Sequence, residues 1–301
     1  MPNYSTRPWI QAALALGALG TFAAATACND EGTAPQDAQR RVYGTALNVG
    51  NGTARSYVLV DADGTTPLEV GVALNEAAME GLPAPMAMPP SSGDGHEHVD
   101  THVYDLTMPA QNPTPYKFVE LDWNPAGHEP PGIYDIPHFD FHFYTITKAQ
   151  RDAIDPTALG EPQFMAKSAA LPAEDQRAPN FVALTAPGAP VVAVPRMGVH
   201  WIDIRTPELQ GMLGHPENAK PFTTTFIHGS WDGQFIFDEP MITRAFIMGR
   251  KTATAAAQRD SLITLPLPAR TAAGLTPGAY HITYDADAKE YRIALTQFVK
   301  K

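Results

Sequence analysis

Proline is spread along almost the whole chain, and this feature constrains the fold more than any other. It accounts for 29 of 301 residues, nearly twice its usual share of about 5%. Each internal proline removes a helical hydrogen bond and clashes with the preceding turn, so a helical bundle or coiled coil is excluded. Apolar residues make up 44% of the chain, which is enough to form a hydrophobic core. We therefore expect short elements joined by turns.

Extended runs of apolar residues are separated by Asn-Gly and Asp-Gly turns, which are strong hairpin signals. A three-stranded meander is predicted over 42–48, 53–60 and 67–72. Further predicted strands are 117–123, 138–146, 199–204, 222–228, 234–242, 280–284 and 290–298, with short helices at 75–80 and 147–154. Residues 229–233 (GSWDG) are expected to form a turn, and 155–196 to form proline-rich loops. The predicted fold is mainly β, with antiparallel sheets in a sandwich- or barrel-like arrangement and two or three short helices.

The N-terminus has the pattern of an export signal. Residues 1–27 carry one charge, Arg7, followed by the apolar run 9–27, which is typical of a cleaved secretory signal peptide. Small residues directly precede Cys28, as in the bacterial lipobox, whose cysteine is acylated. Lipidation of Cys28 would anchor the protein to a membrane of the cell envelope; the alternative is an ordinary signal peptide with an incidental cysteine. Residues 28–41 are predicted to be a lipidated flexible tether, and 42–301 a single β-rich domain.

Charge and cysteine content exclude several functions. With 21 basic and 32 acidic residues the net charge is −11, which would repel phosphate backbones, so no nucleic-acid partner is expected. A single cysteine excludes an internal disulfide and a thiolate-held cluster. A homo-oligomer is compatible with the sequence.

The most unusual stretch is 137–144 (PHFDFHFY). Alternate side chains of a strand point to opposite faces, so His138, Asp140 and His142 share one face and three phenylalanines share the other. His138 and His142 are four positions apart, roughly 13 Å along the strand, so both imidazoles would have to lean inward to reach one metal ion. The alternative is that this polar face simply meets solvent.

Two other predicted strands supply potential ligands, His200 and Glu239. Three histidines and a carboxylate from neighbouring strands often bind one divalent ion. We therefore predict that His138, His142, His200 and Glu239 hold a single divalent transition metal, zinc in the first place, with iron, manganese or copper as alternatives. A buried Glu239 requires either this role or a partner such as Arg244. In the competing interpretation the histidines are structural.

Several further residues are secondary candidates. Asp140 lies between the two strand histidines, His128 could act as a hydrogen-bond donor behind the ligands, and His228 lies in the adjacent predicted hairpin. His98 and His102 belong to a histidine-rich tract at 95–102, which follows Met86 and Met88. Methionine together with histidine suits copper, although exposed loop histidines commonly bind nothing specific. Alternatively, His98 or His102 could fold over the main site.

Several segments together resemble one family. They are 50–55 (GNGTAR), 123–125 (WNP), 127–132 (GHEPPG), 137–144, 197–201 (MGVHW) and 239–243 (EPMIT). The chain resembles an uncharacterised family of bacterial secreted proteins, one member of which is controlled by an extracytoplasmic stress sigma factor and its anti-sigma factor. The resemblance implies a single fold in the cell envelope but no reaction. It also ranks His228 below the other histidines, because that family often has another aromatic residue there.

Two functions follow as hypotheses. In the first, the protein is an exported metalloprotein, in one version a metal-dependent enzyme. In the second, it is a non-catalytic envelope protein with a stress-related binding or assembly role and structural histidines.

Overall fold

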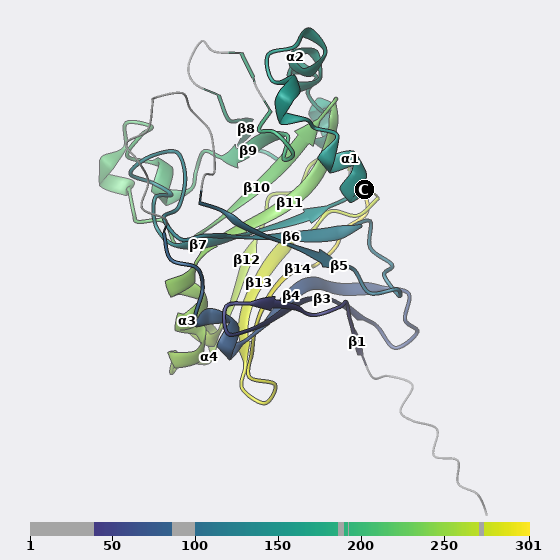
Figure 1. The fold of residues 1–301 in the computed structure, drawn as a ribbon, viewed down its shortest axis with the longest axis vertical. Helices are drawn as coiled ribbons and strands as arrows, with labels where there is room; N and C mark the ends of the chain where they lie inside the picture. Colours follow the sequence, from purple (N-terminus) through teal and green to yellow (C-terminus); the bar gives the residue numbers. More distant parts are fainter. Residues whose placement is uncertain (1–38, 86–99, 186–189, 192, 271–273) are drawn as a thin grey trace, which may run out of the picture. The chain divides into compact units, whose positions relative to one another are not determined.

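The computed structural model describes residues 39–85, 100–185, 190–191, 193–270 and 274–301 (Figure 1). It is mainly β and built from two antiparallel sheets, which confirms the predicted fold class. Residues Asp37–Lys301 form one compact unit. In the part of the chain that is described, no helix is long and apolar enough to span a membrane. Several predictions fall outside the described residues: the predicted signal peptide at 1–27, Cys28, the predicted tether up to residue 38, Met86, Met88 and His98.

The first sheet pairs the two ends of the domain sequence. Its strands are, in spatial order, β1 (Arg40–Tyr43), β3 (Gly52–Val60), β4 (Pro67–Asn75), β14 (Glu290–Thr296), β13 (Ala279–Asp285) and β12 (Asp260–Thr264), with β2 (Leu47–Val49) also paired to β3. The predicted hairpins at both ends of the domain are present. Because β14 pairs with β4, residues more than two hundred positions apart lie side by side.

The second sheet consists of the middle of the chain. Its order is β5 (His102–Thr107), β6 (Phe118–Asn124), β7 (His138–Tyr144), β11 (Gln234–Thr243), β10 (Thr224–Trp231), β9 (Val199–Asp203) and β8 (Phe181–Ala183). Figure 1 shows β7, β11 and β10 as neighbours at the centre of this sheet. The strands predicted to carry potential ligands therefore lie in one sheet.

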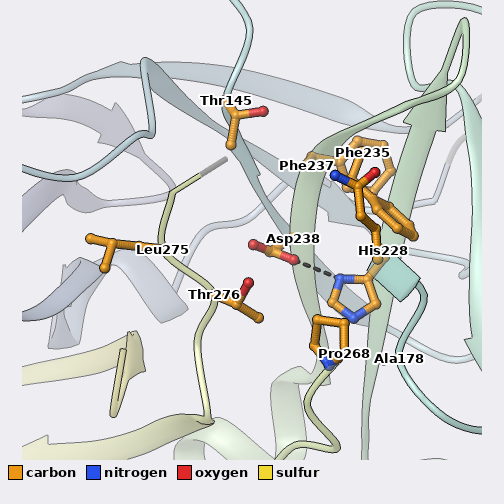
Figure 2. Close-up of a pocket in the computed structure, with 10 residues that line it drawn as sticks. Thr145, Ala178, His228, Phe235, Phe237, Asp238, Pro268, Leu275 and Thr276 are labelled. Carbon is orange, nitrogen blue, oxygen red and sulfur yellow. Dashed lines mark hydrogen bonds and ion pairs between the residues drawn. The ribbon is translucent and has the colours of Figure 1, made fainter. Parts of the chain in front are cut away.

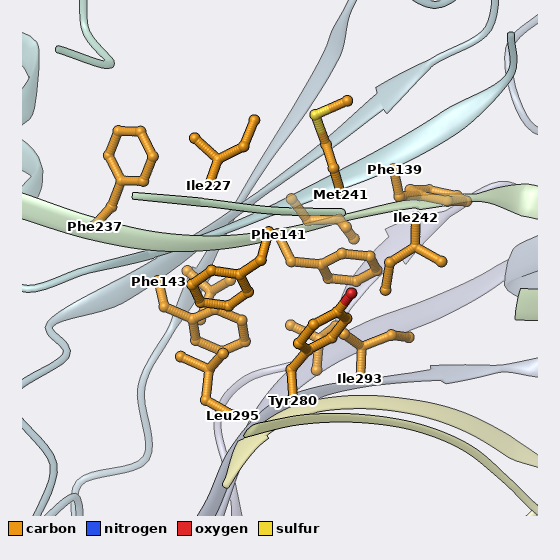
Figure 3. Packing of buried hydrophobic residues seen from close by; sticks show 14 of the residues in the cluster. Phe139, Phe141, Phe143, Ile227, Phe237, Met241, Ile242, Tyr280, Ile293 and Leu295 are labelled. Atoms are coloured by element: carbon orange, nitrogen blue, oxygen red, sulfur yellow. The ribbon is translucent and has the colours of Figure 1, made fainter. Parts of the chain in front are cut away.

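The hydrophobic core lies between the two sheets. Phe139, Phe141 and Phe143 of β7 are fully buried, and Figure 3 shows them facing Tyr280 and Ile293 of the first sheet. Burying each such ring contributes about 2 kcal/mol. This phenylalanine face fixes the orientation of β7, so its histidine face points away from the first sheet.

Helices are short and lie at the ends of strands. The α-helices are α1 (Lys148–Asp152), α2 (Pro162–Ala169), α3 (Arg244–Thr252) and α4 (Ala256–Arg259); the 3₁₀ helices are η1 (Glu76–Met79), η2 (Pro156–Ala158), η3 (Glu174–Gln176), η4 (Pro207–Leu209) and η5 (Pro216–Asn218). The start of α1 is as predicted: Thr147 caps it, in a capping box with Gln150. Strands β5 and β12 and helix α3 were not predicted, and 155–196 contains α2 and β8 rather than loops alone.

The predicted turn at 229–233 is wrong in its extent. Strand β10 continues through Gly229 and Ser230 to Trp231, and the chain reverses over Asp232 and Gly233. A β-bulge at Gly229 and Ser230 keeps the two strands paired. Gly229 is needed inside the strand for packing, as described below, and not for a turn.

Candidate metal centre

The polar face of β7 is buried. His138, Asp140 and His142 are at most 3% exposed, so the interpretation in which this face meets solvent is wrong. On the neighbouring strand β6, Asn124, Asp122 and Glu120 lie opposite these residues in register. All three β6 side chains are also buried. The second sheet therefore has a buried polar face directly behind the phenylalanine face that forms the core.

Three potential ligands from three strands converge on this face. One ligand atom each from His142 of β7, His200 of β9 and Glu239 of β11 lies within 4.8 Å of the others. The Oε2 atom of Glu239 is 3.5 Å from Nε2 of His142 and 4.0 Å from Nε2 of His200. The structure thus brings together three of the four predicted ligands, in a set of two imidazoles and one carboxylate.

Gly229 explains how His200 reaches this group although β10 separates β9 from β11. Gly229 lies between His200 of β9 and Phe237 of β11 in the register of the sheet. A Cβ atom at Gly229 would lie 1.9 Å from the Phe237 ring, so only glycine leaves room for that ring. The ring occupies this space and packs edge-on against His142 and His200, with centroids 4.9 and 5.5 Å apart.

Asp122 lies behind His142. The Nδ1 atom of His142 is 3.5 Å from Oδ2 of Asp122, and Nε2 is on the side of Glu239. Glu120, Asp122 and His142 also form a group that could itself hold an ion. However, Glu120 pairs with the buried Arg151 of α1. The positive charge of Arg151 already balances that of Glu120. A metal ion held by Glu120, Asp122 and His142 is therefore less favourable than one held by His142, His200 and Glu239.

The fourth predicted ligand, His138, lies in a different group with His128 and Asp140. The Nδ1 atom of His138 is 2.7 Å from the carbonyl oxygen of Ile136, which turns Nε2 towards Asp140, 3.2 Å from its Oδ1 atom. His138 and His142 are four positions apart, roughly 13 Å along the strand, and each is held by its own partners. The predicted four-residue set is therefore divided between two groups.

Burial and mutual repulsion perturb the carboxylates of this face. Burial, and then the charges of Asp140 and Glu120, raise the pKa of Glu239 well above its usual value. The pKa of Asp122 is raised for the same reasons, and burial raises that of Glu120 to about 7 although Arg151 opposes the shift. Burial alone would also raise the pKa of Asp140, but His138 and His128 hold it well below its usual value. Such groups are costly to bury without a compensating cation.

His228 does not join either group. The ring of His228 contacts Phe226, two positions before it on the same face of β10. Phe226 in turn contacts Tyr280 of the first sheet, so His228 lies on the face that points towards that sheet. Figure 2 shows His228 bonded to Asp238. Both residues line a small cavity, whose volume is about 40 Å³. The Nδ1–Oδ1 distance is 2.6 Å, and Tyr116 donates a hydrogen bond to the other oxygen of Asp238. Because adjacent residues alternate between faces, this bond is separated from Glu239 by the sheet.

The remaining predicted residues have other positions. His102 lies opposite Trp123, whose ring packs on Phe139, so it belongs to the core-facing side of β5; its side chain is 33% exposed. Arg244 donates to the carbonyl oxygen of Met79, so it is not the predicted partner of Glu239. His98 lies outside the described residues.

Sequence reasoning missed the contribution of β6. Glu120 and Asp122 are two positions apart within the predicted strand 117–123, the same spacing as the successive polar residues of the predicted strand 138–146. This repeated spacing could have indicated a second polar row. The ion pair of Arg151 with Glu120 could not have been read from the sequence, because it joins α1 to β6 across the fold.

Comparisons with known proteins give one partial match. A family model described as TTHB210-like, hypothetical protein TTHB210, matches residues 61–123. The matched segment includes Glu120 and Asp122 and ends before all the histidines of both groups. No curated protein and no solved structure matches the chain significantly.

Proposed function

We propose that the protein binds a divalent transition metal ion through His142, His200 and Glu239. The convergence of these three side chains from three separate strands carries the proposal. Oε2 of Glu239 is buried and has no hydrogen-bond partner among the described residues, an arrangement that a cation would compensate. Two imidazoles and one carboxylate suit zinc, iron or manganese, and zinc remains the first choice.

The surroundings of the group favour holding an ion over rapid turnover. His142 and Glu239 are 1% and 2% exposed, while the His200 side chain is 13% exposed, so the His200 side is nearest to solvent. An ion with three protein ligands keeps a position for water and lowers the pKa of that water towards neutrality. One form of the proposal is a hydrolytic enzyme that uses this water. The burial of His142 and Glu239 favours the other form, a non-catalytic metal-binding protein.

We further propose that this centre functions outside the cytoplasm, on a lipid-anchored protein of the bacterial envelope. The apolar run 9–27 and the small residues before Cys28 support this location.

The metal proposal is tested by elemental analysis of protein purified without a metal-affinity tag. We expect His200→Ala to lower the bound metal by about one equivalent per chain, because a ligand is lost while the buried part of the group stays intact. His215→Ala is the matched control, since the His215 side chain directly before η5 is 60% exposed. Less than a tenth of an equivalent in the unaltered protein, or the same content in His200→Ala, would refute the proposal.

A further inference from the structure

A second group of ligands lies at the other end of the same buried face. His128 belongs to the loop between β6 and β7, and His138 and Asp140 belong to β7; their ligand atoms lie within 4.8 Å of one another. We infer that these three residues form a second, separate binding site for a divalent transition metal ion. This inference goes beyond the proposed function, because the two groups share no residue.

The hydrogen bonds of the two imidazoles support a cation at this point. Nδ1 of His138 is 2.7 Å from the carbonyl oxygen of Ile136, and Nδ1 of His128 is 2.7 Å from that of Glu129. A carbonyl oxygen only accepts, so each Nδ1 carries the proton and donates it. In a neutral imidazole this leaves the lone pair on Nε2, the arrangement typical of histidines that bind metals.

Both Nε2 atoms face the same carboxylate. That of His138 is 3.2 Å from Oδ1 of Asp140, and that of His128 is 3.4 Å from Oδ2. The side-chain amide of Asn124 donates to Oδ2 at 2.7 Å. Within the described part of the chain, Oδ1 of Asp140 and Nε2 of His138 have no hydrogen-bond partner. Their residues are 3% and 0% exposed, so buried acceptors point at one another.

Aromatic rings pack against both histidines of this group. The ring of Phe222 packs edge-on against His138 at a centroid distance of 5.5 Å, and Tyr134 packs against His128 at 6.0 Å. The His128 side chain, at 12% exposed, is the member nearest to solvent. Each of the two groups thus combines two deeply buried ligands with one histidine at the edge, through which an ion could enter.

A proton is the competing occupant. If the histidines were imidazolium ions, they would pair with Asp140 and no metal would be needed. A proton on Nε2 of His138 would satisfy that atom and Oδ1 of Asp140, whereas a metal ion would bind all three side chains at once. Metal content separates the two cases.

The test compares the cobalt and zinc stoichiometry of chelator-treated protein by equilibrium dialysis. We expect His128→Gln and His200→Ala each to lower the stoichiometry by one equivalent of metal per chain. Because the two sites are separate, the double variant should lose two equivalents. Asp140→Asn, which keeps the shape of the side chain, should reproduce the loss seen in His128→Gln. His215→Gln is the surface control, and circular dichroism checks that each variant is folded.

The outcomes separate the two sites. Unchanged stoichiometry in both folded His128→Gln and Asp140→Asn would overturn the second site and leave the first intact. Loss in His128→Gln combined with no change in His200→Ala would support the second site and refute the proposed function. If His128→Gln fails to fold, Asp140→Asn alone decides.

Discussion

At the scale of single residues, histidines play two different parts in this protein. Those of the buried face lie against carboxylates in surroundings that favour a cation, whereas His281 on the first sheet forms ordinary ion pairs. His281 contacts Glu69, 3.5 Å away, and Asp260. Burial alone would lower the pKa of His281, but the hydrogen bonds with Glu69 and Asp260 outweigh it and raise this pKa above its ordinary value of 6.5.

This raised pKa predicts a pH-dependent contribution to stability. A group with a raised pKa in the folded state stabilises fully below pH 6.5, and the stabilisation is lost as the pH rises through the folded-state pKa. We expect His281→Gln to reduce the free energy of unfolding by roughly 0.5 kcal/mol near pH 5.5 and by much less at pH 9. Urea unfolding at both pH values measures this, with His215→Gln as control. A larger loss of unfolding free energy in His281→Gln at pH 9 than at pH 5.5 would contradict the raised pKa of His281.

At the scale of elements, the second sheet depends on one close approach. Gly229 of β10 lets the Phe237 ring of β11 lie across the strand, where the ring contacts His142 and His200. We expect Gly229→Ala to destabilise the protein by about 1–3 kcal/mol, because the ring must move in a packed interior. Thermal unfolding measures the change.

A glycine in another element provides the matched control for this substitution. A Cβ atom at Gly249 of α3 meets nothing within 4 Å. Gly249→Ala should therefore stabilise by about 0.5–1 kcal/mol through helix propensity. Equal effects of the two substitutions would show that the approach of Phe237 to β10 does not matter.

The same elements show what could be predicted from the sequence. Alternation along 138–144 was enough to place the phenylalanines in the core and the histidines on the opposite face, because a strand has a period of two. The strand order was not available from this pattern. Only the pairing of β7 with β11, and of β9 with β10, brings Glu239 and His200 to His142. Backbone carbonyls of the β6–β7 loop turn His128 and His138 towards Asp140, and no residue spacing indicates that.

At the scale of the whole molecule, the proposed membrane location would require a covalent anchor, because the chain is acidic. Its net charge of −11 opposes electrostatic binding to anionic lipid surfaces. A lipidated cysteine would supply this attachment, since each buried methylene contributes about 0.8 kcal/mol and two or more acyl chains anchor a protein stably. Cys28 is the only cysteine, so the proposed anchor would depend on this one residue.

We therefore expect Cys28→Ala to move the protein from the membrane fraction to the soluble fraction of the cell envelope. Fractionation followed by immunoblotting measures the distribution, and Ser91→Ala serves as a small-residue control. The metal content of the released protein should equal that of the anchored form, because the proposed ligands all lie within the compact unit Asp37–Lys301. Membrane attachment that persists in Cys28→Ala would refute lipidation while leaving both metal sites open to their own tests.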